Sequence, residues 1–243
     1  MYLIADIGNT RIKLAVYEED ELLSFSAAPR RFALLGLKKV LVANPVTAAI
    51  LSNTSEVDPT VIQLLSSLPF FIHLDQNTPI PIINKYLTPH TLGKDRIAAA
   101  VAAKKRFGGK AVLFIDMGTC ITMNFINSSS VFIGGNISPG INMRLRAMHK
   151  YTARLPKAPL QIPDEYFGSD TIKALQNGAI KGTFREIDTF IEETHQKFGA
   201  INVILTGGDA HLFENYTKNK IFVAPNLVLE GLNEILKYNV DKN

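Results

Sequence analysis

Two short stretches of the sequence, D-I-G-N-T at residues 6–10 and D-M-G-T at residues 116–119, place an aspartate two positions before a glycine and close to a threonine. The glycine lets the backbone turn tightly and approach a ligand, so the amides and the threonine hydroxyl beyond it can donate to phosphate oxygens. The aspartate supplies a hard oxygen ligand for a hydrated cation. Both stretches therefore carry residue types suited to a nucleotide phosphate tail and its cation.

The two turns lie in matching contexts, 110 positions apart (116 minus 6). Residues 2–17 read YLIADIGNTRIKLAVY and residues 111–126 read AVLFIDMGTCITMNFI, so each turn joins an apolar strand to a second strand. A single turn of this kind is also ordinary hairpin chemistry. The repetition favours a duplicated strand-turn-strand unit with facing carboxylates, which would hold one phosphate tail between two related halves.

Three further charged residues could take part in chemistry on a phosphate. Lys13 follows the first turn and can reach a phosphate tail, although a lysine on a strand face is often only solvated. Asp95 and Arg96 open the segment IAAAVAAKKRF, which is typical of a helix. A carboxylate in the first turn of a helix is stabilised by the helix dipole, so capping alone explains Asp95. Alternatively, Asp95 accepts a proton from an attacking hydroxyl and Arg96 holds an anionic group of the acceptor.

Composition indicates an ordinary globular chain. The 243 residues, 47% of them hydrophobic, are enough for one large or two small domains with proper cores. The formal charge of +4 is mild, and the longest basic run, residues 104–106, suits a helix end rather than a nucleic-acid patch. The single cysteine, Cys120, cannot form an internal disulfide, and no apolar run reaches the length of a membrane span. We therefore expect a cytoplasmic protein without a membrane or nucleic-acid partner.

The alternation of apolar segments and breaks predicts an α/β fold with mixed sheets and helical cover. Gly108 and Gly109 end the alanine-rich helix and mark the boundary between halves at residues 1–108 and 109–243. In the first half we expect strands at residues 2–7, 11–17, 21–26, 39–43 and 70–74, and helical character across residues 47–68. His73 falls in one of these strands, which predicts a packed core histidine.

A long helix is predicted from residue 171 to about residue 198 in the second half. Its Gly178 and Gly182 lower helix propensity, which favours close packing against another helix, including one from a second subunit. The strand at residues 201–205 leads into T-G-G-D at residues 206–209. A paired glycine after a strand permits a flat ligand such as adenine to lie against the backbone, although a simple strand-to-helix turn is equally compatible.

Taken together, the motifs resemble those of type III pantothenate kinase, over nearly the whole chain and in the right order. They are D-I-G-N-T at 6–10, G-K-D-R at 93–96, D-M-G-T at 116–119, G-G-N-I-S-P-G at 134–140, S-D-T-I-K-A-L-Q-N-G at 169–178 and T-G-G-D at 206–209. The resemblance implies the acetate and sugar kinase, Hsp70 and actin superfold, with two duplicated ribonuclease-H-like domains, mixed sheets and a cleft between them. It also implies ATP-dependent phosphorylation of pantothenate, the first step of coenzyme A synthesis.

The resemblance further implies magnesium, a monovalent cation (potassium or ammonium) and a homodimer. Carried onto this sequence, it assigns Asp95 as the proton acceptor in direct in-line transfer and Asp116 as the potassium ligand, with magnesium held at Asp6 through the phosphates. The implied ATP-binding residues are Asp6, Ile7, Gly8, Asn9, Thr10, Arg11, Ile12, Lys13 and Thr119. The implied pantothenate-binding residues are Tyr86, Gly93, Lys94, Asp95, Arg96 and Thr171, the last acting across the dimer.

The sequence departs mildly from the family pattern. Lys94 stands where alanine is common, and Cys120 follows the second turn where small residues are usual, so both could alter the site. Two other functions remain compatible with the motifs: another small-molecule kinase of the same superfold, and a nucleotide-binding regulatory protein without turnover. Arg96 favours an acidic acceptor over a sugar, and the presence of Asp6, Asp95 and Asp116 favours catalysis over regulation.

Overall fold

The computed structural model of the chain describes residues 1–9, 11–54 and 56–242; Thr10, which was predicted to bind ATP, lies outside them. The chain forms two compact units. Unit 1 contains Met1–Gly108, Ser130–Ile133 and the chain from Asn226 onward, and unit 2 contains Gly109–Ser129 and Gly134–Pro225. The predicted boundary after residue 108 coincides with the end of the first segment of unit 1. The C-terminal helix, which sequence order assigned to the second half, belongs to unit 1.

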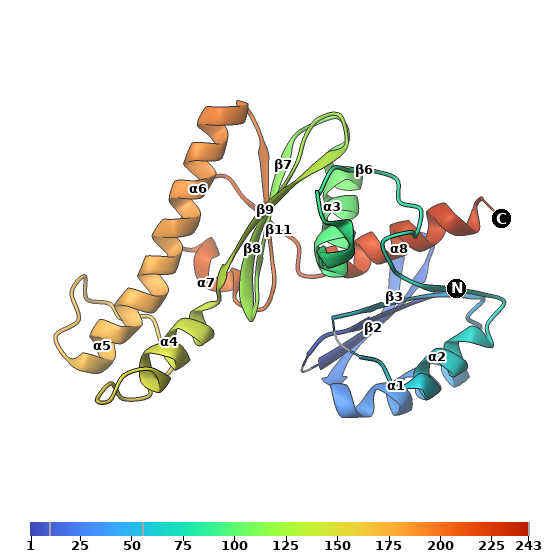
Figure 1. Ribbon diagram of the computed structural model, residues 1–243, viewed down its shortest axis with the longest axis horizontal. Helices are drawn as coiled ribbons and strands as arrows, with labels where there is room; N and C mark the ends of the chain where they lie inside the picture. The colour runs from blue at the N-terminus through green and yellow to red at the C-terminus, as the bar shows by residue number, and fades with distance from the viewer. Residues whose placement is uncertain (10, 55, 243) are drawn as a thin grey trace. The chain divides into compact units, whose positions relative to one another are not determined.

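Unit 1 is built on a five-stranded mixed sheet in the order β3-β2-β1-β4-β5 (Figure 1). The strands are β1 (Tyr2–Ile7), β2 (Arg11–Glu18), β3 (Glu21–Pro29), β4 (Ala48–Asn53) and β5 (Phe70–His73). The central strand β1 pairs antiparallel with β2 and parallel with β4. Its residues alternate between the two faces of the sheet, and both faces are buried, which explains its nearly continuous apolar sequence.

Helices cover both faces of this sheet (Figure 1). Helices α1 (Ala33–Ala43) and α2 (Pro59–Ser66) pack on one face, against a core that includes Leu3, Ala5 and Ile7 of β1. Helices α3 (Lys94–Phe107) and α8 (Leu227–Val240) pack against each other, and α8 also contacts β1 and β4. A Cβ on Gly231 of α8 would lie 1.7 Å from the carbonyl oxygen of Ala98, so only glycine permits this approach.

Three assignments from the sequence were wrong in this unit. Residues 39–43, predicted as a strand, end α1, and residues 47–68, predicted as helical, contain β4 as well as α2. His73, predicted to lie in the core, is an exposed residue at the end of β5. Unit 1 also contains the short helices η1 (Arg30–Phe32) and η2 (Pro89–Thr91), and the strand β6 (Ile83–Asn84), which pairs with the first residues of β9 (Val131–Pro139).

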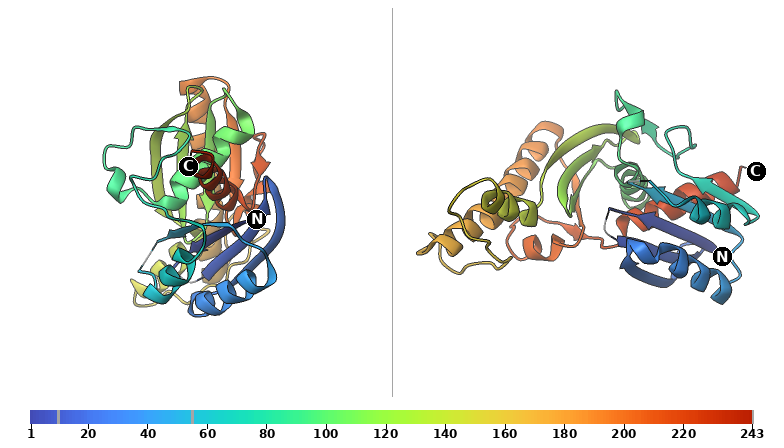
Figure 2. Two further views of the ribbon diagram at one scale, coloured as in Figure 1. Left: turned by 90° about the vertical axis from the view of Figure 1, so that its right-hand side faces the viewer. Right: turned by 60° about the horizontal axis from the view of Figure 1, so that its bottom comes forward.

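Unit 2 repeats the plan of a mixed sheet covered by helices (Figure 2). Its strands follow the order β11-β10-β7-β8-β9. Its strands are β7 (Val112–Met117), β8 (Cys120–Ile126), the greater part of β9, β10 (Asn202–Thr206) and β11 (Phe222–Val223). Its helices are α4 (Ile141–Lys150), α5 (Thr171–Gln176), the π-helical segment η3 (Asn177–Lys181), α6 (Gly182–Phe198) and α7 (Ala210–Glu214). Among the described residues, no helix has the length and apolar character needed to cross a membrane.

Candidate functional site

The first acidic turn lies at the carboxyl end of β1, in the middle of the unit 1 sheet. Asp6 is the cross-strand partner of Lys13 on β2 and of Ser52 on β4. The turn is closed by the Gly8 amide, which donates to the Arg11 carbonyl at 2.9 Å. Ile7 and Ile12 point into the core, so they can offer a ligand only their backbone groups. The sheet register thus places one carboxylate, one ammonium and one hydroxyl side by side.

Burial raises the pKa of Asp6 above the ordinary carboxyl value of 3.8. Lys13 opposes this shift, the negative charge of Asp95 adds to it, and the Ser52 hydroxyl slightly lowers the pKa. Nevertheless, neither Oδ1 of Asp6 nor Oγ of Ser52 forms a hydrogen bond of normal geometry with the described residues. A buried carboxylate oxygen of this kind is suited to a cation, which would lower the pKa again.

Asp95 is the second residue of α3, two positions after the N-cap residue Gly93. Its Oδ1 accepts a hydrogen bond from the Arg96 amide at 2.8 Å. A Cβ on Gly93 would lie 2.5 Å from this oxygen, so glycine leaves room for the carboxylate to fold back over the helix start. The local capping contact considered from the sequence is therefore present. The same carboxylate is also near enough to Asp6 to raise its pKa.

The guanidinium of Arg96 lies over two aromatic rings. Its Cζ is 5.3 Å from the ring centroid of Tyr86 and 5.9 Å from that of Phe132. The two rings are 6.2 Å apart and tilted by 37°. Arg96 is only 5% exposed, and such a desolvated cation interacts strongly with a carboxylate.

Lys94 joins the start of α3 to the ends of two strands. Its ammonium donates to Oδ1 of Asn53 at 2.7 Å, and Nε2 of His73 lies 2.8 Å from the same oxygen. Burial lowers the pKa of Lys94, with Asp75 acting in the opposite direction. Burial, followed by the charge of Lys94, lowers the pKa of His73. A neutral imidazole that donates from Nε2 fits this arrangement, because an amide oxygen can only accept.

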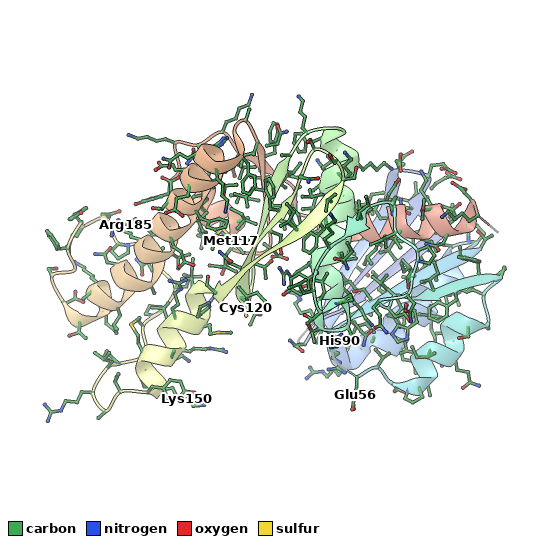
Figure 3. The ribbon with its side chains drawn as sticks, turned by 45° about the horizontal axis from the view of Figure 1, so that its top comes forward. Glu56, His90, Met117, Cys120, Lys150 and Arg185 are labelled. Carbon is green, nitrogen blue, oxygen red and sulfur yellow. The ribbon has the colours of Figure 1, made fainter. Side chains whose placement is uncertain are left out.

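The second acidic turn, in unit 2, is enclosed by glycines. Figure 3 labels Met117 and Cys120, which end β7 and begin β8 on either side of this turn. A Cβ on Gly207 would lie 2.4 Å from Oδ1 of Asp116, and one on Gly140 would lie 2.5 Å from the Thr119 carbonyl oxygen. Gly207 thus lets its segment approach the Asp116 carboxylate, and Gly140 lets its segment approach the backbone of the turn itself.

The other predicted residues of unit 2 line two different hollows. Thr119 lines a hollow of about 540 Å³ together with Arg146, Gly208 and Asp209. Burial raises the pKa of Asp209. Thr171 is the first residue of α5 and lines a separate hollow of about 650 Å³. Thr119 and Thr171 are therefore not brought together within this unit.

The acidic residues of both turns fit the cations that the sequence implied. Among the described residues, no cluster of three or more histidine, cysteine or acidic side chains could hold a metal by itself. The buried Oδ1 of Asp6 fits magnesium that takes its other ligands from phosphates. The oxygen-rich cradle around Asp116, which a Cβ on Gly207 would fill, fits a larger cation bound by carboxylate and carbonyl oxygens.

Comparison with known proteins identifies the family. The family described as type III pantothenate kinase matches residues 2–193. A type III pantothenate kinase of Bacteroides fragilis is 43% identical over 242 residues, which are 98% of this chain and 98% of that protein. The chain belongs to the type III pantothenate kinase family. This family assignment, predicted from the motifs, is thereby confirmed, and it makes the chain a kinase.

Solved structures confirm the predicted ribonuclease-H-like, actin-like fold with mixed sheets. A Baf family protein from Campylobacter jejuni is 23% identical, with a TM-score of 0.62, and the match covers 98% of this chain and 99% of that one. A ROK family glucokinase from Streptomyces griseus is 14% identical, with a TM-score of 0.53 and coverage of 97% and 99%. At these identities the similarity concerns the fold alone.

Within this type III pantothenate kinase fold, three residues beside the predicted site residues were not found from the sequence. Ser52 and Asn53 end β4, next to the first turn, and Phe132, the second residue of β9, lies beside Arg96. Parallel pairing brings β4 next to β1, and the β6 pairing brings β9 next to Tyr86. None of the three belongs to a motif. Ser52 and Asn53 would have been found if residues 48–53 had been predicted as a strand beside β1.

Proposed function

We propose that this chain transfers the γ-phosphoryl group of ATP to the primary hydroxyl of pantothenate, giving 4'-phosphopantothenate for coenzyme A synthesis. Membership of the type III pantothenate kinase family supports this proposal. The observation that carries the chemistry is that Lys13 and Asp95 both act electrostatically on the buried Asp6 carboxylate. A phosphate-binding group, a cation ligand and a proton acceptor thus belong to one neighbourhood of unit 1.

Each residue then has a chemical role. The pantothenate hydroxyl oxygen attacks the γ-phosphorus, the bond from that phosphorus to the bridging oxygen of ADP breaks, and the hydroxyl proton passes to Asp95. Lys13 stabilises charge on the phosphate oxygens, and Arg96 binds the pantothenate carboxylate. Magnesium, when bound at Asp6, neutralises further phosphate charge. Positioning and charge stabilisation by these side chains account for most of the rate.

We further propose that Asp116 binds potassium or ammonium and that residues 6–13 and Thr119 contact ATP. Pantothenate is contacted by Tyr86, residues 93–96 and Thr171. The enclosing glycine at position 207 supports the cation at Asp116. A homodimer, with Thr171 acting across it, and a cytoplasmic location complete the proposal.

The test is a pantothenate-dependent ATP consumption assay in potassium buffer and in sodium buffer. We expect turnover that requires pantothenate and is faster in potassium. Asp95→Asn should lower kcat by about 10²- to 10⁴-fold, the usual contribution of a general base. The asparagine keeps an oxygen that can accept from the Arg96 amide, so the start of α3 is preserved.

Asp58→Asn is the matched control. Asp58 also accepts a local backbone hydrogen bond, from the Thr60 amide at 2.9 Å, but it caps α2 and has no proposed role in binding or catalysis. Its substitution should leave kcat unchanged. ATP hydrolysis that does not depend on pantothenate, or equal rates for the wild type and Asp95→Asn, would contradict the proposed chemistry.

A further inference from the structure

Phe132 is a buried aromatic residue directly beside the proposed pantothenate site. It is fully buried, so it cannot touch a substrate. Its ring nevertheless lies 5.9 Å from Cζ of Arg96 and 6.2 Å from the ring of Tyr86. Phe132 therefore contacts two proposed substrate-binding residues while remaining outside any contact with substrate itself.

The position of this ring is fixed by a short strand pairing. The Ile83 amide donates to the Ser130 carbonyl at 2.9 Å, and the Lys85 amide donates to the Phe132 carbonyl at 3.1 Å. The next residue, Tyr86, donates its amide to Oδ1 of Asn84 at 3.0 Å. These bonds hold Tyr86 and Phe132 in register, so that both rings lie beside the same guanidinium.

A guanidinium beside two rings is stabilised by their negative faces and is kept away from water. The guanidinium carries its N–H donors in a planar fork, which matches the geometry of a carboxylate. Packing against two neighbouring rings also limits the rotamers of a long side chain, which lowers the entropy lost when it binds a carboxylate.

We infer that Phe132 is a positioning residue for pantothenate binding, which acts by holding Arg96 in an aromatic clamp with Tyr86. The inference rests on the proposed role of Arg96 toward the pantothenate carboxylate. It predicts an effect on the KM for pantothenate and none on kcat, because the clamp acts on binding of a remote anionic group rather than on the reacting atoms.

The test replaces Phe132 site-specifically with mono-, di- and trifluorophenylalanine. Fluorination withdraws electron density from the ring face and weakens cation–π attraction with little change in shape. The KM for pantothenate should rise stepwise, reaching about 3- to 10-fold with the trifluoro ring, at constant kcat and constant KM for ATP. Phe132→Leu, which keeps an apolar side chain, should raise the same KM.

The same fluorinated residues at Phe213 provide the control. Phe213 is equally buried and packs against the rings of Phe184 and Tyr216 in unit 2. Fluorination there should leave the KM for pantothenate unchanged. A constant KM across the Phe132 series, or equal effects at both positions, would overturn the inference.

Arg96→Gln separates this inference from the proposed function. A large rise in the KM for pantothenate in Arg96→Gln, together with a flat fluorination series, rejects the clamp and leaves the role of Arg96 intact. An unchanged KM in Arg96→Gln rejects the substrate role of Arg96 and the clamp with it. A wild-type chain that does not phosphorylate pantothenate rejects the proposed function itself.

Discussion

Asp6 carries a carboxylate in a buried position, so the proposed phosphate site lowers the stability of the folded chain. Its pKa is raised mainly by burial, so the folded chain binds this proton more tightly than the unfolded chain. The stability contributed by the proton is fully present below pH 3.8, the unfolded value, and is lost as the pH rises through the folded pKa. Ionised Asp6 therefore destabilises the chain at neutral pH when no cation is bound.

We predict that Asp6→Asn inactivates the enzyme yet raises its melting temperature at neutral pH, by about 2–4 °C for each kcal/mol gained. The gain should shrink as the pH falls through the raised pKa of folded Asp6, because the buried carboxyl then becomes neutral. Scanning calorimetry across this pH range measures both effects. A melting temperature below that of the wild type at neutral pH would show that the interaction with Lys13 outweighs burial.

Asp58→Ala is a control for which the expected change in melting temperature at neutral pH has the opposite sign. Hydrogen bonds from the side chain and amide of Thr60 lower the pKa of Asp58. Stability from such a group is present above its unfolded pKa and is lost as the pH falls through the folded value. This variant should therefore melt below the wild type at neutral pH, and the difference should shrink in acid.

At the level of elements, the start of α3 is tied to the end of β4 through Lys94 and Asn53. This bond joins the helix that carries Asp95 to the strand whose Ser52 lies opposite Asp6. We predict that Lys94→Ala and Asn53→Ala each lower kcat by about 10-fold or more, because small displacements of a reacting group reduce the rate strongly.

A double-mutant cycle tests this prediction. If the two residues act as a pair, Lys94→Ala/Asn53→Ala should be little worse than either single variant, with about 0.5–3 kcal/mol of coupling. Lys38→Ala, which changes an exposed lysine on α1, should leave kcat unchanged. Strictly additive losses would mean that the Lys94–Asn53 bond does not position Asp95.

Strands β1, β4 and β7 show which elements of the fold could be predicted from the sequence and which could not. The turns after β1 and β7 were found because an aspartate and a glycine at fixed spacing follow a strongly apolar strand. Strand β4 (AAILSN) was assigned to a helical region because it is buried on both faces and lacks alternation, and short apolar runs of this kind do not distinguish strand from helix. Residues 39–43 (KVLVA) are another short apolar run, and they were predicted as a strand although they belong to helix α1.

The candidate site was predictable only where a motif carried it. Asp6, Asp95 and Arg96 were identified from local patterns. Asn53 and Phe132 reach the site through long-range strand pairing, and a one-residue change of register would turn their side chains to the other face. Short-range sequence patterns do not show which distant strands pair, so the sequence alone could not assign these residues to the site.

At the scale of the whole molecule, the chain returns to unit 1 after completing unit 2. Helix α8 rests on α3, with Gly231 against the carbonyl oxygen of Ala98. We predict that Gly231→Ala lowers stability by about 1–3 kcal/mol, the usual cost of overpacking a close contact, although alanine favours helix. Calorimetry should show this loss, and an unchanged melting temperature would mean that α3 and α8 separate readily.

Gly182 differs from Gly231 in its surroundings and tests whether a second subunit packs on α6. Its backbone is helical, with φ −61° and ψ −46°, and no described atom beyond its chain neighbours and its own helix backbone lies within 4 Å of a Cβ built there. Alanine should therefore fit without strain and raise stability by about 0.4–1 kcal/mol, because it restricts the unfolded chain. Calorimetry and light scattering should show a higher melting temperature at unchanged molecular mass. A lower melting temperature with loss of dimer mass would instead indicate that a helix of a second copy packs over this glycine, as the low helix propensity of Gly178 and Gly182 favoured.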